Sequence, residues 1–292
     1  MRLRLKAPAR FDFARTVQGH GWWTLPPFDA PGDASSLRTT LEGSGGAGVP
    51  LRLTPIEGVV VAETPGRGDA GLRAAVRRAA RRMLCLDLDL GPFHEAALER
   101  RETAWMAERC AGRLLRAPTG FEDLVKLVLT TNCSWSLTTR MVEQLIERWG
   151  ARAADGTRAF PGPAALRSAG ECGLRAAGCG YRAPLLAELA RRVDDGEVDP
   201  ESWDGDDRDP SELRAELLHL PGVGPYVAEN VLRLAGRPDG PGLDSWLRAA
   251  YARVYHGGRR VTDRTIVRRY ARFGRWSGLA LWCDLTRDWF DE

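Results

Sequence analysis

Polar and apolar residues alternate along about the first sixty positions of the chain, a pattern typical of half-buried β-strands. Strict alternation covers 2–6 (RLRLK) and 50–55 (PLRLTP), and 57–64 (EGVVVAET) is β-branched and apolar. The glycine-rich stretch 43–50 is expected to be a loop or a hairpin connection. The chain is therefore predicted to begin with an antiparallel β-sheet.

From about residue 92 the apolar residues recur with the period of an α-helix instead. Phe121, Leu124 and Val128, for example, fall on one helix face. Helices are predicted over 70–84, 121–129, 141–149, 183–193, 210–219, 225–235, 245–256, 262–273 and 276–288. The pattern predicts an α+β fold, with an N-terminal β-rich domain over 1–91 and an all-helical domain over 92–292.

Charge is distributed unevenly although the net charge is only +3. The first basic run contains Arg73, Arg77, Arg78, Arg81 and Arg82, and the second contains Arg259, Arg260, Arg264, Arg268, Arg269, Arg272 and Arg275. The stretch 194–209 between them is strongly acidic. Locally basic faces on a nearly neutral protein fit a nucleic-acid surface. For the first run a solvated helix face is the expected interpretation.

The six cysteines predict no chemistry. They are scattered without a signal peptide before them, which is typical of a reduced, intracellular protein. Cys172 and Cys179 lie close together but lack the further cysteines of a zinc or iron–sulfur site, so neither is expected. No apolar stretch is long enough to cross a membrane. A cytoplasmic protein is expected.

The stretch L-P-G-V-G at 220–224 joins two predicted helices and is the most specific motif of the chain. Gly222 can adopt positive φ without steric cost, and Gly224 allows another backbone to approach the next helix. The free N–H groups at that helix start, Tyr226 and Val227 among them, would form a phosphate site. The alternative is a plain corner between two helices in which glycine is the C-cap.

A family resemblance rests on this motif and on an aspartate that comes after it. The stretch 220–230, a loop and then Asp244, twenty residues after Gly224, resembles the helix-hairpin-helix-GPD (HhH-GPD) superfamily of DNA glycosylases. The segments 121–150, 178–190 and 273–285 are similar to segments of 8-oxoguanine glycosylases and, for the last one, of alkylpurine glycosylases such as 3-methyladenine DNA glycosylase II. The N-terminal strands resemble the TBP-like β domain of these enzymes.

The resemblance implies that Asp244 is the catalytic residue. Breaking the bond between base and sugar develops positive charge on the deoxyribose, and a carboxylate beside the sugar stabilises that charge and orients water. Asp244 can also be read as the N-cap of the helix that starts at Ser245. The two roles are compatible, because a cap holds the carboxylate in place.

Tyr226 occupies the position at which lyase-competent members of the family carry a lysine. A phenol cannot form a Schiff base with the sugar. The resemblance therefore implies a monofunctional enzyme, which leaves an abasic site in an intact strand.

The damaged base must leave the helical stack to reach Asp244, and protein groups must fill the gap. The resemblance assigns this to Asn132, Tyr181 and Arg182, with Arg182 bonding the edge of the partner base. Alternatively, Asn132 is a turn residue and Tyr181 a packed aromatic.

The base pocket is expected to use aromatic faces, on which electron-poor alkylated bases stack well. By resemblance Trp246, Trp135 and Trp282 lie near the cleft, and Trp246 is the first candidate because it follows Asp244 by two positions. Most of the ten tryptophans are expected in the core.

Together these features predict a monomeric, nucleoid-associated enzyme that excises an alkylated purine from damaged duplex DNA. An oxidised-purine glycosylase is the alternative, and a non-catalytic damage sensor is a rival of another class. No cofactor is expected to be required. The resemblance places an optional Na⁺ or K⁺ on the backbone carbonyls of Leu218, Leu220 and Val223.

Overall fold

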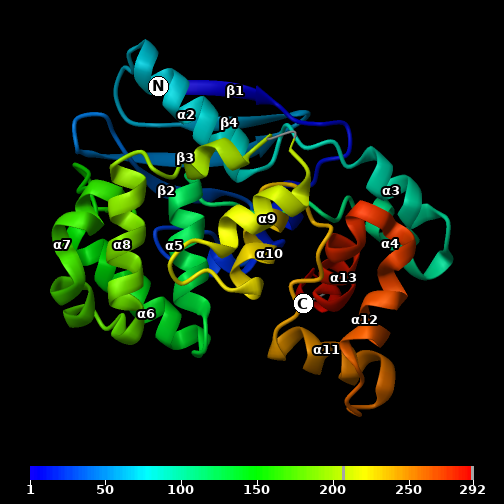
Figure 1. Cartoon of the computed structure of the whole chain (residues 1–292). Helices are drawn as coiled ribbons and strands as arrows, with labels where there is room; N and C mark the ends of the chain where they lie inside the picture. Colours follow the sequence, from blue (N-terminus) through cyan, green and yellow to red (C-terminus); the bar gives the residue numbers. More distant parts are fainter. Residues whose placement is uncertain (206–207, 291–292) are drawn as a thin grey trace.

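The computed structural model describes residues 1–205 and 208–290, so Asp206 and Asp207 of the acidic stretch lie outside the described residues. The chain begins with a four-stranded antiparallel sheet of order β1-β4-β3-β2 (Figure 1). Its strands are β1 (Arg2–Lys6), β2 (Leu37–Glu42), β3 (Gly48–Ile56) and β4 (Val59–Glu63). The predicted strands and the α+β fold class are confirmed.

Strand β2 is not among the predicted strands. Its sequence, LRTTLE, shows no regular alternation of apolar and polar residues, and two of its polar residues, Thr39 and Thr40, are buried. Thr40 Oγ1 lies 2.8 Å from Thr157 Oγ1, so its buried hydroxyl has a partner. The predicted loop is also too long, since β3 begins at Gly48, whose N–H donates to the Arg152 carbonyl at 2.9 Å.

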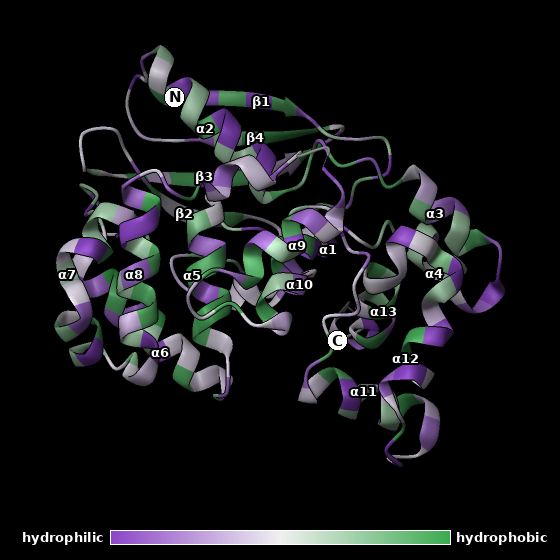
Figure 2. Ribbon diagram, in the orientation of Figure 1, coloured by the Kyte–Doolittle hydropathy of each residue, from purple (hydrophilic) through white to green (hydrophobic). Residues whose placement is uncertain are grey.

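Helix α2 (Ala70–Met83) packs on this sheet. Asp69 caps it by accepting the Leu72 N–H at 2.7 Å. Val76, Ala80 and Met83 form its buried face, while Arg73, Arg77 and Arg78 are exposed. Arg82 is the exception, since its nearly buried guanidinium pairs with Asp123. Figure 2 shows green and purple bands alternating along the ribbon of α2.

The remainder of the fold is helical. The other helices are α1 (Phe13–Gln18), α3 (Gly91–Leu98), α4 (Arg101–Glu108), α5 (Gly120–Thr130), α6 (Trp135–Trp149), α7 (Pro163–Ala176), α8 (Ala183–Asp194), α9 (Pro210–Leu218), α10 (Pro225–Leu234), α11 (Ser245–His256), α12 (Asp263–Tyr270) and α13 (Ser277–Leu285). Short 3₁₀ turns are η1 (Gly21–Thr24), η2 (Gly180–Arg182), η3 (Pro200–Trp203), η4 (Ala271–Trp276) and η5 (Arg287–Phe290). The predicted helix over 276–288 is thus shorter, because it breaks after Leu285.

Helix α5 is the buried axis of the molecule. Lys126, in its middle, is fully buried, and its Nζ lies 2.5 Å from Glu122 and 4.9 Å from the centre of the Phe28 ring. Trp22, from the N-terminal segment, donates its indole N–H to Asp123 at 2.6 Å. Residues near the start of the chain therefore pack against α5, and the boundary expected between residues 91 and 92 stays a prediction.

Within the described residues, none of the helices combines the length and the apolar character that crossing a membrane requires.

Candidate active site

The hairpin turn between α9 and α10 has the backbone that its glycines predict. Gly222 has φ +77°, in the left-handed region. The Val223 N–H donates to the Leu220 carbonyl at 3.1 Å and closes the turn. A Cβ at Gly222 would lie 3.3 Å from the Leu185 side chain. The protein itself therefore requires a glycine at position 222.

Gly224 differs from Gly222. It is the N-cap of α10, has ordinary extended angles, and makes no side-chain cap. A Cβ built at Gly224 would meet nothing within 4 Å. No contact inside the described protein explains this glycine, whereas a phosphate backbone approaching the first turn of α10 would. The N–H groups of Tyr226 and Val227 belong to that first turn, where an α-helix leaves its N–H groups free.

Substitution of Gly222 is expected to affect stability, and substitution of Gly224 is expected to affect DNA binding. Gly222→Ala is expected to lower the free energy of unfolding by about 1–2 kcal/mol, because alanine is strained in the left-handed region. Gly224→Ser should retain or raise stability, since serine is a good N-cap. It should weaken duplex binding about tenfold, the equivalent of one charge-assisted hydrogen bond. Chemical denaturation and fluorescence anisotropy measure the two effects. If Gly224→Ser leaves duplex affinity unchanged, the phosphate site is wrong.

The loop between α5 and α6 meets the turn η2. Asn132 has φ +48°, and its Nδ2 lies 3.3 Å from the Tyr181 hydroxyl, which in turn donates to the Thr131 carbonyl at 3.4 Å. Tyr181 is 54% exposed, so its ring is not packed in the core. The two predicted gap-filling residues are therefore neighbours at the surface.

Arg182 lies beneath this pair and is buried. Its Nε donates to Thr131 Oγ1 at 3.3 Å, and its guanidinium also bonds the Thr131 carbonyl. The guanidinium carbon lies 4.4 Å from the centre of the Tyr181 ring. Arg182 thus holds the loop and the tyrosine together in this structure, and its bond to a partner base stays a prediction.

Asp244 is half-buried at the start of α11. Its Oδ1 accepts the Leu247 N–H at 2.6 Å, so the N-cap role is confirmed. Its Oδ2 makes no hydrogen bond to the part of the chain that the structure describes. One carboxylate oxygen is therefore fixed by the helix and the other is left for a ligand.

The loop before Asp244 is tied down on two sides. Arg233 donates to the Pro241 carbonyl at 2.9 Å, and the Gly278 N–H donates to the Pro238 carbonyl at 2.9 Å. A Cβ at Gly278 would lie 1.9 Å from the Gly240 carbonyl oxygen, so the loop packs directly on α13. These contacts set the position of the carboxylate.

Tyr226 lies in the first turn of α10, within hydrogen-bonding reach of Thr130 at the end of α5 and within the electrostatic influence of Asp244. Burial raises the pKa of its phenol, and the negative charge of Asp244 adds to this, while a hydrogen bond with Thr130 opposes it. The phenol is therefore neutral at physiological pH. The chain has only two lysines, Lys6 and Lys126. Lys6 lies on the exposed side of β1 and Lys126 is paired with Glu122, so neither replaces the missing amine at this position.

The predicted pocket tryptophans belong to one row of aromatic rings. Trp282 and Trp289 have ring centres 5.7 Å apart, and those of Trp289 and Trp246 are 5.6 Å apart. Trp246 is 39% exposed, whereas Trp282 is half-buried and donates its indole N–H to the Gly19 carbonyl at 2.9 Å. The guanidinium carbon of Arg233 lies 5.1 Å from the Trp282 ring centre.

His20 continues the row towards Trp135 and is not among the residues predicted from the sequence. Its ring stacks on Trp282 at 5.5 Å and meets Trp22 edge-on at 4.4 Å. Trp22 stacks on Trp135 at 6.4 Å. A lone histidine in the stretch GHGWW carries no periodic signal, and only long-range packing shows its place.

The His20 imidazole is neutral. Burial lowers its pKa to about 3; Asp123 opposes this, and Arg233 and Lys126 reinforce it. Its Nδ1 is buried and has no hydrogen-bond partner among the described residues. Buried polar atoms without a partner are uncommon, so Nδ1 is a candidate contact for a base once the neighbouring rings shift.

His20 makes stability depend on pH. Because its folded pKa lies below the unfolded value of 6.5, its contribution is complete above pH 6.5 and is lost as pH falls towards 3. Between about pH 7 and pH 5 the loss should be about 2 kcal/mol. His20→Phe keeps an aromatic ring and removes the titration. The free energy of unfolding of both proteins is measured at pH 7 and pH 5, and the loss between the two pH values should be smaller in His20→Phe than in the wild type. An equal loss in both proteins would mean that His20 is not buried in its neutral form.

A cation at the hairpin would use backbone oxygens only. The carbonyls of Leu218, Leu220 and Val223 belong to one turn, and such hard oxygen ligands suit Na⁺ or K⁺. The Leu220 carbonyl already accepts one hydrogen bond, from Val223. Among the described side chains, no group of three histidines, cysteines or carboxylates could hold a metal ion.

Comparison with known proteins shows the family and the fold. Residues 125–273 match the family model described as HhH-GPD superfamily base excision DNA repair protein. A protein of Methanothermobacter thermautotrophicus named "Probable N-glycosylase/DNA lyase" is 31% identical over 206 residues, which cover 62% of this chain and 64% of that protein. The match thus spans less than two thirds of the length of the curated relative.

Two solved structures share the fold over almost the whole chain. The 3-methyladenine DNA glycosylase from Archaeoglobus fulgidus superposes with a TM-score of 0.78 at 22% identity, over 99% of both chains. The 8-oxoguanine glycosylase/lyase of Clostridium acetobutylicum, solved with double-stranded DNA, gives 0.70 at 16% identity, over 99% of this chain and 98% of that one. At these identities the likeness establishes the fold alone.

Proposed function

Because the chain belongs to the HhH-GPD superfamily of base excision DNA repair proteins, we propose that it is a monofunctional DNA glycosylase. The observation that carries this proposal is the half-buried Asp244, whose Oδ1 caps helix α11 while its Oδ2 has no hydrogen bond to the described residues. Tyr226, a phenol within its electrostatic influence, stands where lyase-competent members carry an amine. A carboxylate in this position stabilises a cationic sugar, and the phenol cannot attack it.

Each part of the site has a role in the proposed reaction. The first turn of α10 binds a phosphate near the lesion, and Asn132 with Tyr181 fills the gap that the flipped base leaves. The base lies against the aromatic row near Trp282. Asp244 stabilises the positive charge that develops on the sugar and orients the attacking water. The strand itself stays intact.

The proposed substrate class is an alkylated purine. The row of rings from Trp246 to Trp135 supplies the electron-rich faces on which an electron-poor base stacks. One observation favours oxidised purines as a second candidate: His20 Nδ1 has no partner among the described residues, and a shift of the neighbouring rings would expose it to the polar edge of such a base.

A lesion panel tests the substrate class. Duplexes carrying 3-methyladenine, ethenoadenine, hypoxanthine, 8-oxoguanine or uracil are incubated with the enzyme, and released base is identified by mass spectrometry. Release of alkylated purine, unaffected by His20→Phe, is the expected result. Release of 8-oxoguanine that His20→Phe abolishes would establish the second candidate instead.

We further propose that the protein acts on damaged duplex DNA as a monomer and requires no cofactor. A single copy supplies all the residues of the proposed site. Light scattering at assay concentration and activity in the presence of a chelator test these two statements.

A further inference from the structure

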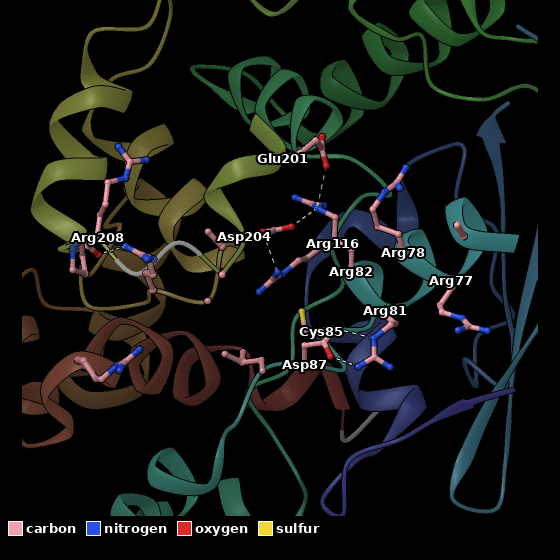
Figure 3. A pocket seen from close by; sticks show the side chains of 18 of the residues that line it. Arg77, Arg78, Arg81, Arg82, Cys85, Asp87, Arg116, Glu201, Asp204 and Arg208 are labelled. Atoms are coloured by element: carbon pink, nitrogen blue, oxygen red, sulfur yellow. Dashed lines mark hydrogen bonds and ion pairs between the residues drawn. The ribbon is translucent and has the colours of Figure 1, made fainter. Parts of the chain in front are cut away.

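An arginine-lined groove lies apart from the candidate active site. Its volume is about 1440 Å³, and α2 forms one wall (Figure 3). The described residues that line it elsewhere include Glu201, Asp204, Arg208, Asp209 and 235–237. It lies beside Ala235, at the C-terminal end of α10, whereas the hairpin turn lies at the N-terminal end. The groove and the hairpin turn therefore lie at opposite ends of α10.

The floor of the groove is electrically balanced. Arg82 Nε lies 2.6 Å from Asp204, and Arg116 lies 3.2 Å from the same carboxylate. Arg81 is paired with Asp87. These ion pairs hold the arginine side chains of the floor in place and balance most of their positive charge.

The rim carries the positive charge that remains. Arg77 and Arg78 of α2 and Arg275 across the groove are exposed, and none of the three has a carboxylate or hydrogen-bond partner among the described residues. In Figure 3 Arg77 and Arg78 extend from α2 beside the floor pairs.

A solvated helix face does not account for this arrangement. Helix α2 has five arginines and no acidic residue. Arg73 and Arg77 are spaced i,i+4, where like charges repel and destabilise a helix by a few tenths of a kcal/mol. Carboxylates balance Arg81 and Arg82, whereas Arg77 and Arg78 next to them on the helix stay unpaired among the described residues. Binding of an anion would relieve this repulsion.

We propose that the groove binds an acidic segment of a partner protein. Arginine forks pair with carboxylates in a bidentate manner, and Ala74, Leu88 and Ala235 provide small apolar surface for a peptide chain. Nucleic acid fits less well. Within the described lining there is no aromatic side chain, so bases of a single strand would have nothing on which to stack.

The test uses the full chain and a fluorescein-labelled peptide of repeating Glu-Gly, with a Gln-Gly peptide for comparison. Anisotropy should show binding of the acidic peptide alone, weakening as salt rises. The double variant R77E/R78E should lose at least about tenfold in affinity. The matched control R4E/R52E reverses two exposed arginines on the sheet and should bind like the wild type.

Three results would overturn the proposal: no binding of the acidic peptide, an equal loss in both double variants, or displacement of the peptide by undamaged duplex. The last would make the groove part of the DNA surface. Because the readout is peptide binding, failure here leaves the glycosylase proposal unaffected.

Discussion

Asp244→Asn is expected to abolish base excision while the protein keeps its fold and its affinity for duplex DNA. The neutral amide cannot stabilise a cationic sugar, so the single-turnover rate should fall at least about 100-fold. Asparagine is as good an N-cap as aspartate, and the Leu247 N–H keeps its acceptor. Duplex affinity should stay equal or rise slightly, since one negative charge near the phosphates is removed.

A second helix-capping aspartate, Asp69, provides the control. Asp69 accepts the Leu72 N–H at the start of α2, away from the hairpin, and Asp69→Asn should leave excision unchanged. Excision that survives in Asp244→Asn would assign the catalytic role to another group. A wild type that binds lesion-containing duplex but excises nothing would favour the damage-sensor alternative.

Tyr226→Lys is expected to convert the enzyme into one that forms a covalent bond with DNA. The wild type should give no adduct when borohydride is added, because Tyr226 is a neutral phenol beside Asp244. An amine on the same helix turn would reach the same sugar, and the Schiff base would be trapped as a protein–DNA band on a denaturing gel. The amount of trapped protein–DNA adduct should rise from background in the wild type to a clearly visible band in Tyr226→Lys.

Tyr226→Phe is the matched control for this substitution. It removes the hydroxyl and its hydrogen bond with Thr130, which should cost about 1 kcal/mol of stability, and it adds no amine. It should give no trapped band. A band from the wild type would show that another amine attacks the sugar, and the assignment of a monofunctional enzyme would then be wrong.

The parts of the site that lie close in sequence could be predicted from it. The turn at Gly222 and the N-cap at Asp244 follow from local backbone rules, and both are observed. Asn132 and Tyr181 are 49 residues apart, and they could be assigned to one site because the family resemblance includes both of their segments.

Other features depend on contacts that no local pattern encodes. His20 meets Trp282 from the opposite end of the chain, and the unpaired Nδ1 is visible only once both are packed. Strand β2 could not be predicted, because Thr39 and Thr40 are buried in the fold but count as polar positions in the sequence pattern, and the Thr157 partner of Thr40 lies far along the chain. The first basic run is typical of a solvated helix face in sequence, and only the fold brings it into one groove with Glu201, Asp204 and Arg208.

The central claim, hydrolysis of the base–sugar bond without strand cleavage, is tested most directly with an end-labelled duplex carrying the lesion that the panel identifies. The products are run with and without hot alkali. The account predicts strand breaks only after alkali treatment, because the enzyme leaves an abasic site in an intact strand. Breaks of equal yield without alkali would contradict it.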